Sequence, residues 1–315
     1  MKSPAYPRPM ASAETSERGG MDLQEGHVTA NGLDFAYLES GSGPLALCLH
    51  GFPDSPYTYR HLMPALAEAG FRAVAPFMRG FAPTAIPADG SYTIPDLIND
   101  ANGLHEALGG DGDAAIIAHD WGALVAWGAP VHAPERWRKV VIANIPPLQV
   151  YGQVLFTPAA IDRVSHFWFF QMAIAEAVVA ADDFAFIDYL WSTWSPGYDA
   201  SEDLPRVKDC LRDPANLSAA LGYYRATFDP ARFGSEQGTA EQGAAWGSIP
   251  SQPTLYLHGT QDGANAIDDA NLAEIGGLLA KGSEAAWVEG AGHFLLLEKP
   301  AEVNHRILQF LEAKV

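Results

Sequence analysis

The stretch that decides the fold reads Ile116-Ile117-Ala118-His119-Asp120-Trp121-Gly122-Ala123. It begins as an apolar β-type run and continues into small residues and a helical pattern, so it predicts a strand, a sharp turn and a helix. Ala118 and Gly122 stand two residues before and after Asp120, where a strained turn that exposes a nucleophile requires small side chains. The pattern predicts a nucleophile elbow with Asp120 as nucleophile. The plainer alternative is an Asp that only caps the helix.

Apolar runs typical of buried strands recur on both sides of this elbow, with helical patterns between them. These runs lie at 45–49, 71–76, 114–118, 139–144, 253–258 and 285–289, and an amphipathic helix over 300–313 closes the chain. Such alternation is typical of an α/β protein with a mostly parallel sheet and helices on both faces.

The alternation is interrupted once, after Pro146 and Pro147, where the sequence becomes aromatic and helical. We therefore expect an inserted helical cap over residues 147–247, within a core formed by residues 25–146 and 248–315. The N-terminal stretch is rich in Pro, Ser, Ala and Gly and lacks the apolar segment of a secretory signal. We expect residues 1–24 to form a mobile tail.

The charge balance limits the partners of the chain. The 19 Lys and Arg residues against 38 Asp and Glu residues give a formal net charge of −19 at pH 7. Such a charge repels nucleic acid and anionic membranes, and no apolar run is long enough to cross a bilayer. Cys48 and Cys210 give neither a disulfide framework nor a metal-binding spacing. We expect no nucleic acid, membrane or metal partner, and a location in the reducing cytoplasm.

Two further polar residues follow predicted strands, as Asp120 does. His293 lies in the glycine-rich run Gly290-Ala291-Gly292-His293-Phe294, and Asp262 follows Leu257-His258-Gly259-Thr260-Gln261. Because the carboxyl ends of parallel strands meet at one edge of a sheet, an imidazole there reaches the elbow as general base. The Asp262 carboxylate is then the group that fixes the tautomer of His293 and stabilises its cation.

A glycine-containing turn completes the predicted site. His50-Gly51-Phe52-Pro53 comes directly after the first buried strand, in the place where a backbone oxyanion hole is expected. Gly51 permits a sharp turn, and Pro53 can hold a bend through a cis bond. We expect the backbone N–H groups of Phe52 and Trp121 to form the oxyanion hole, and His50 to be structural.

A carboxylate nucleophile determines the chemistry. A carboxylate does not make a productive acyl-enzyme from an ester, but it displaces a leaving group at a saturated carbon and forms an alkyl ester. His293 would then activate water to hydrolyse this ester, without any cofactor.

Four motifs together resemble the epoxide hydrolases of the α/β-hydrolase family, of which the haloalkane dehalogenases are near relatives. They are the HGFP turn at 50–53, Met78-Arg79-Gly80-Phe81, the HDWGA elbow at 119–123 and the Gly292-His293-Phe294 loop. The resemblance extends from Val28 to the C-terminus and is weaker in the cap. It implies the α/β-hydrolase fold, a mostly parallel eight-stranded sheet with helices on both faces and an inserted helical cap.

In epoxide hydrolases of this type, two cap tyrosines hydrogen-bond the epoxide oxygen. Gly222-Tyr223-Tyr224-Arg225 is similar to the segment that supplies one of them, which matches Tyr224, with Tyr223 as the alternative. The segment similar to the other is Ser165-His166-Phe167-Trp168-Phe169-Phe170-Gln171, where His166 stands in place of the tyrosine. His166 would donate a hydrogen bond to the oxygen, hold a halide, or only pack within the cap.

The resemblance implies an epoxide hydrolase that opens a small hydrophobic neutral epoxide to a diol with water. Phe167, Trp168 and Tyr223 are expected in the wall of its pocket. Fluoroacetate dehalogenases carry arginines where Trp121 and Leu124 stand here, which disfavours a carboxylate substrate. Two alternatives remain: a haloalkane dehalogenase that uses Trp121 and Trp168 as halide donors, and a non-catalytic ligand-binding protein on this fold.

Overall fold

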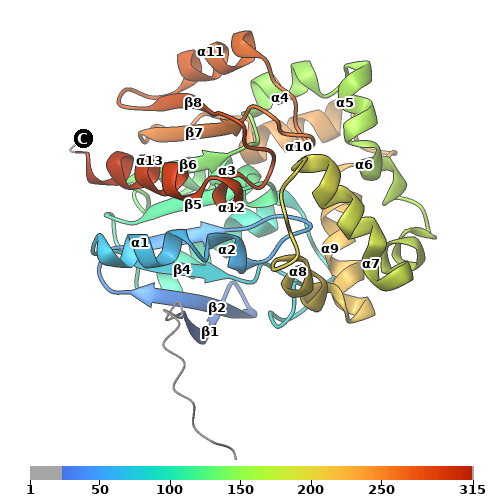
Figure 1. Ribbon diagram of the computed structural model, residues 1–315, viewed down its shortest axis with the longest axis horizontal. Coiled ribbons are helices and arrows are strands. Elements are labelled where there is room, and N and C mark those ends of the chain that lie inside the picture. The colour runs from blue at the N-terminus through green and yellow to red at the C-terminus, as the bar shows by residue number, and fades with distance from the viewer. Residues whose placement is uncertain (1–22, 314–315) are drawn as a thin grey trace, which may run out of the picture.

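A computed structural model describes residues 23–313, which form an eight-stranded sheet flanked by helices (Figure 1). The spatial order of the strands is β1-β2-β4-β3-β5-β6-β7-β8, and only the pairs that involve β1 and β2 are antiparallel. The strands are β1 Gln24–Ala30, β2 Leu33–Gly41, β3 Leu45–Leu49, β4 Arg72–Pro76, β5 Ala115–His119, β6 Lys139–Ala143, β7 Thr254–Gly259 and β8 Glu284–Val288.

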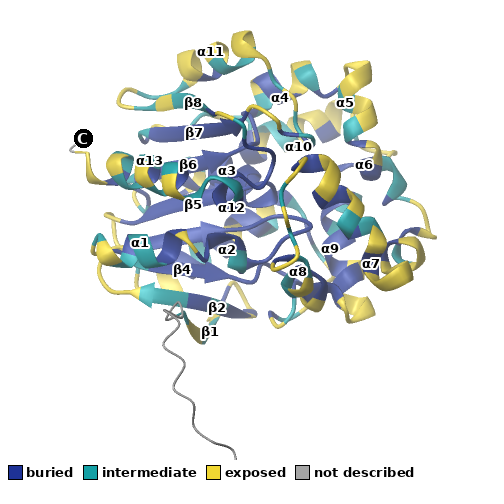
Figure 2. Cartoon of the chain, in the orientation of Figure 1, coloured by how far each residue is buried: buried dark blue, intermediate teal, exposed yellow. Residues whose placement is uncertain are grey.

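The central strands are buried on both faces. Every residue of β3, β5, β6 and β7 is buried, as Figure 2 shows in dark blue. Parallel strands covered by helices on both sides carry continuous apolar runs of this kind, which is why they were recognisable in the sequence. The core helices are α1 Leu62–Glu68, α2 Ile94–Ala107, α3 Trp121–His132, α11 Asp269–Leu278, α12 Leu295–Glu298 and α13 Pro300–Glu312.

The helices lie in two layers over the sheet. Helices α1 and α13 pack against each other on one face, and α2 and α3 pack against each other on the other (Figure 1). The predicted fold class, an α/β-hydrolase fold with a mostly parallel eight-stranded sheet, is confirmed.

Seven helices stand between β6 and β7, and α5 to α9 gather beside one edge of the sheet (Figure 1). They are α4 Leu148–Val154, α5 Pro158–Arg163, α6 Ser165–Phe169, α7 Ala175–Trp194, α8 Leu204–Leu211, α9 Pro214–Thr227 and α10 Glu236–Trp246. The buried Arg60 guanidinium pairs with the buried Asp203 carboxylate at the start of α8, which ties this group of helices to the core.

The structure differs from the sequence pattern at one helix. The helical pattern near 57–69 is divided into a 3-10 turn, Pro56–Tyr59, and the α-helix α1. Pro64 lies in the first turn of α1 and has no N–H to donate to the Arg60 carbonyl, so a single α-helix cannot run through this point. Most of the tail predicted over 1–24 lies outside the described residues, and Gln24 already belongs to β1.

Among residues 23–313, no helix is both long and apolar enough to span a membrane.

Candidate active site

The strand β5 ends in a strained turn at Asp120. Asp120 has φ +53° and ψ −121°, a conformation that L-residues rarely adopt and that occurs where the surrounding structure enforces it. A β-carbon at Gly122 would lie only 2.2 Å from the Leu49 carbonyl oxygen, so only glycine fits two residues after Asp120. The turn lifts the Asp120 side chain away from the sheet and into a cavity.

The Asp120 carboxylate is held from both sides. Its Oδ1 accepts a hydrogen bond of 2.7 Å from the Phe52 backbone N–H, and its Oδ2 lies 3.5 Å from Nε2 of His293. Burial would raise the pKa of Asp120, but the neighbouring His293 and the Phe52 N–H outweigh burial and lower it. Asp120 is therefore ionised at neutral pH, as a nucleophile must be.

His293 bridges the two carboxylates. Its Nδ1–H donates to Asp262, with distances of 3.2 Å to Oδ1 and 3.1 Å to Oδ2, so that Nε2 faces Asp120. Burial disfavours the cation, but the charges of Asp262 and Asp120 outweigh it and raise the pKa of His293 to about 10. The unreacted site thus contains an imidazolium between two carboxylates.

Backbone contacts fix the loops that carry His293 and Asp262. The Trp194 carbonyl, at the end of α7, accepts from the N–H of Gly263 (3.0 Å) and from that of His293 (3.0 Å). The His293 carbonyl accepts from Nε2 of His119 at 2.9 Å and from the Asn144 amide. These contacts hold the general base and its orienting acid in one arrangement.

The HGFP turn takes the predicted place beside the nucleophile. The Phe52–Pro53 bond is cis, and Trp121 begins α3, so its backbone N–H has no carbonyl partner within the helix. A β-carbon at Gly51 would lie 2.1 Å from Oδ1 of Asp120. His50 accepts from the Met78 N–H through Nε2 (3.0 Å) and donates through Nδ1 to the Gly51 carbonyl (2.9 Å), which makes it a structural residue.

Tyr224 and His166 lie beside each other in the cavity wall, close to the elbow. The ring of Tyr224 is 4.9 Å from that of Trp121 and 5.4 Å from that of His166, and both side chains line the cavity. Burial raises the pKa of Tyr224 well above its usual value, so its hydroxyl stays protonated. Burial lowers the pKa of His166 to about 3, so its ring is neutral and carries one N–H.

The structure does not bring two of the predicted wall residues to the cavity. The Tyr223 hydroxyl donates to the Arg79 carbonyl at 2.8 Å, and its ring stacks on Tyr92. Trp168 packs against Phe228 and Phe233 but does not itself line the cavity. Phe167, in contrast, lines the cavity and stacks on Phe228 at 4.1 Å.

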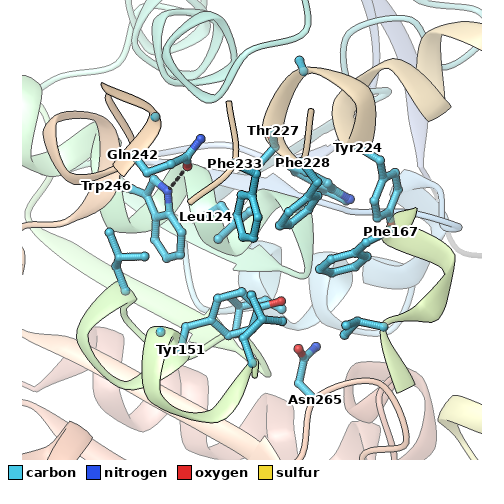
Figure 3. A pocket seen from close by; sticks show the side chains of 18 of the residues that line it. Leu124, Tyr151, Phe167, Tyr224, Thr227, Phe228, Phe233, Gln242, Trp246 and Asn265 are labelled. Atoms are coloured by element: carbon cyan, nitrogen blue, oxygen red, sulfur yellow. Dashed lines mark hydrogen bonds between the residues drawn. The ribbon is translucent and has the colours of Figure 1, made fainter. Parts of the chain in front are cut away.

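The cavity itself has a volume of about 340 Å³ and is lined largely by apolar and aromatic side chains (Figure 3). Besides the residues already named, its wall includes Leu124, Ile145, Leu148, Tyr151, Leu155, Val164, Trp194, Trp246 and Asn265. Within the described residues, no cluster of His, Cys, Asp and Glu has the arrangement of a metal site.

Sequence reasoning missed three residues of this site, namely Tyr151, Asn265 and Asn144. Tyr151 and Asn265 line the cavity, and the Asn144 amide donates to the His293 carbonyl. Asn144 directly follows β6, and this position at a strand end was the only signal in the sequence for any of the three. Tyr151 and Asn265 reach the cavity through packing between distant segments. Trp194 also lines the cavity, and its ring lies 5.1 Å from both His166 and His293.

Comparison with known proteins places the chain in a family. Residues 44–300 match the family model of the alpha/beta hydrolase fold, and the protein belongs to the α/β-hydrolase family. Within that family it is an epoxide hydrolase-like member. It is 29% identical over 318 residues to an epoxide hydrolase of Caballeronia sordidicola, with 92% of this chain and 94% of that protein covered.

Two further relatives agree with this placement. The chain is 30% identical over 310 residues to epoxide hydrolase 2 of Siraitia grosvenorii, covering 90% of this chain and 97% of that protein. The crystal structure of an epoxide hydrolase from Vigna radiata superposes with a TM-score of 0.77 at 25% identity, covering 94% of this chain and 99% of that chain. The predicted family and the predicted enzyme class, a hydrolase, are confirmed.

Proposed function

We propose that this protein is an epoxide hydrolase that converts a small, hydrophobic, neutral epoxide to a diol through an ester on Asp120. The observation that carries the proposal is the ionised Asp120 carboxylate at the elbow, which lies 3.5 Å from His293 in a cavity that Tyr224 and His166 also line. The names of the relatives support the same reaction.

In the first step, Oδ2 of Asp120 attacks an epoxide carbon, because Oδ1 is engaged by the Phe52 N–H. The new carbon–oxygen bond forms as the ring bond breaks, and the released oxygen takes the Tyr224 proton. The neutral His166 donates its N–H to the same oxygen. Tyr224 and His166 thus replace the pair of tyrosines expected from the family.

Ester formation itself prepares the general base for the second step. The ester carries no charge, so His293 loses one of the two carboxylates that raise its pKa. Its proton then returns to the Tyr224 phenolate, and the neutral imidazole can accept a proton from water. The conversion of His293 from acid to base follows from a change of charge at Asp120.

In the second step, water gives a proton to His293 and adds to the ester carbonyl carbon. Negative charge develops on the Asp120 oxygen that the Phe52 N–H already contacts, with the Trp121 N–H as the second donor. Collapse breaks the bond between this carbon and the diol oxygen, and that oxygen takes the remaining proton of the hydroxyl that water added. The diol leaves with an oxygen of Asp120, and the carboxylate and the imidazolium are restored.

We further propose that residues 147–247 act as a cap that supplies the apolar wall and the two acid groups. Free, buried Cys48 and Cys210 support a reducing cytoplasmic location. Haloalkane dehalogenation is the second candidate, because the Trp121 indole stands beside the nucleophile. It is less favoured because a departing halide needs no proton from Tyr224, and Trp168, its other expected donor, does not line the cavity.

The test uses the His293→Gln variant, in which the ester should accumulate. The variant is incubated with matched panels of epoxides and alkyl halides, and the masses of peptides containing Asp120 are measured by mass spectrometry. We expect an adduct of the intact epoxide mass on Asp120, and none in the double variant Asp120→Asn, His293→Gln. An adduct with halides alone would favour dehalogenation, and no adduct with either panel would refute the covalent mechanism.

A further inference from the structure

Two polar side chains enter the apolar cavity without a part in the proposed reaction. Tyr151 comes from α4 and Asn265 from the loop after β7, and in Figure 3 the polar ends of both point into the cavity. Within residues 23–313 neither side-chain end has a hydrogen-bond partner, and the hydrogen bonds of Asn265 are made by its backbone. These residues, here called the Tyr151–Asn265 pair, stand among aliphatic and aromatic neighbours.

Two larger polar side chains of the cavity wall already have partners. Gln242 accepts a hydrogen bond of 2.7 Å from the Trp246 indole, and Arg232 pairs with Glu241 at the exposed rim. Thr227 also lines the cavity, and its hydroxyl is buried and makes no hydrogen bond within residues 23–313. The Tyr151–Asn265 pair therefore offers hydrogen bonds that the protein itself does not use.

The pair is held in place rather than free to move. The Asn265 N–H donates to Oδ1 of Asp262 at 3.0 Å, and its carbonyl accepts from Nε2 of His258 at 2.8 Å. The Tyr151 ring is buried beside the indole of Trp246, with 6.2 Å between the ring centroids. The Tyr151 ring and the Asn265 backbone are therefore fixed before a ligand binds, which lowers the cost of ordering the site.

Both members are influenced by the catalytic carboxylates. The Asn265 N–H donates directly to Asp262. Burial raises the pKa of Tyr151 most, and the charges of Asp120 and Asp262 raise it further. The hydroxyl therefore remains a donor, and a negatively charged substituent would be repelled by the same two carboxylates. An uncharged oxygen can accept from both the phenol O–H and the amide N–H.

We propose that the Tyr151–Asn265 pair is a second polar subsite, which binds a hydroxyl or carbonyl oxygen carried by the epoxide substrate away from its ring. The inference rests on the proposed epoxide hydrolysis and narrows its substrate class to neutral epoxides that bear such an oxygen. Hydrogen-bonding groups built into an apolar pocket discriminate strongly against a substrate that leaves them unpaired. Tyr224 and His166 remain the partners of the epoxide oxygen.

The test compares a series of hydroxyalkyl epoxides with alkyl epoxides of the same chain length. Tyr151→Phe and Asn265→Leu remove the polar ends and keep the size of each side chain, and Tyr189→Phe, at a side chain that is 60% exposed, is the control. Each single substitution should lower kcat/KM about tenfold for the preferred hydroxyalkyl epoxide. The alkyl epoxide should be unaffected, and the wild type should prefer the hydroxyalkyl substrate.

The outcomes separate the subsite from the reaction. An equal loss with both substrates would overturn the subsite and assign Tyr151 to the reacting groups. No loss with either substrate would also overturn it, because the pair would then touch no substrate oxygen. If the wild type turned over no epoxide and His293→Gln formed no ester, both the proposed function and the proposed subsite would be refuted. Thermal unfolding of each variant identifies losses caused by misfolding.

Discussion

Replacing Gly51 with alanine tests how closely the HGFP turn packs against the nucleophile, Asp120. The added β-carbon would lie 2.1 Å from Oδ1 and 2.4 Å from Cβ of Asp120. Asp120 cannot retreat with its backbone, because Gly122 is packed against the Leu49 carbonyl. The carboxylate must therefore move by about 1 Å or more to restore a normal contact near 3.5 Å.

The expected loss follows from two effects. A displacement of about 1 Å costs roughly 100-fold in rate, and losing one oxyanion donor costs about 10²–10³ in kcat. The two effects overlap, because both act through the hydrogen bond from the Phe52 N–H to Oδ1. We expect kcat/KM to fall about 1,000-fold, which corresponds to about 4 kcal/mol of transition-state stabilisation.

The assay is steady-state diol formation, with Gly277→Ala as the matched control. Gly277 lies in α11, and a β-carbon there would meet nothing within 4 Å. The control should keep its activity and gain up to about 1 kcal/mol of stability, because alanine favours a helix. Full activity in a folded Gly51→Ala protein would refute the argument that this turn and the carboxylate are in tight contact.

Four other predictions concern the remaining residues of the site. Asp262→Asn should lower kcat about 10³–10⁴-fold while the ester on Asp120 accumulates, since the His293 cation loses its partner; rapid ester breakdown would count against this role. Tyr224→Phe should slow epoxide opening about 10²-fold or more without slowing attack on an alkyl halide, as measured by single-turnover ester formation. Trp168→Ala should change kcat/KM less than about threefold, because Trp168 lies outside the cavity wall. The folded pKa of His293 is raised to about 10, so its contribution to stability is present below its unfolded pKa and is lost as pH rises through about 10. Chemical unfolding between pH 7 and pH 10 should thus show a steeper loss for the wild type than for His293→Gln.

The catalytic residues were accessible to sequence reasoning because each is defined by a local pattern. Asp120, Asp262 and His293 all follow strands of the parallel sheet, and the topology brings such positions together at one edge. The turn at Gly51 and Phe52 also follows a strand of this sheet, β3. The distances of 3.1–3.5 Å around His293 are what the structure adds to this prediction.

The cavity wall was less predictable, because neighbouring residues of a helix point in different directions. Phe167 and Tyr224 line the cavity, while their neighbours Trp168 and Tyr223 do not, and the Tyr223 hydroxyl donates to the Arg79 carbonyl. Successive side chains differ by about 100° around a helix, so the orientation depends on how the helix packs. That packing involves segments far apart in the chain, and no local pattern encodes it.

The covalent role of Asp120 is tested most directly by a single turnover in water enriched in ¹⁸O, with enzyme in excess over epoxide. If the ester forms and water attacks its carbonyl carbon, the diol carries an unlabelled oxygen from Asp120, and ¹⁸O appears in the peptide containing Asp120. If water attacks the epoxide directly, the diol carries the ¹⁸O and the Asp120 peptide stays unlabelled. The first result is the one predicted here, and the second would contradict it.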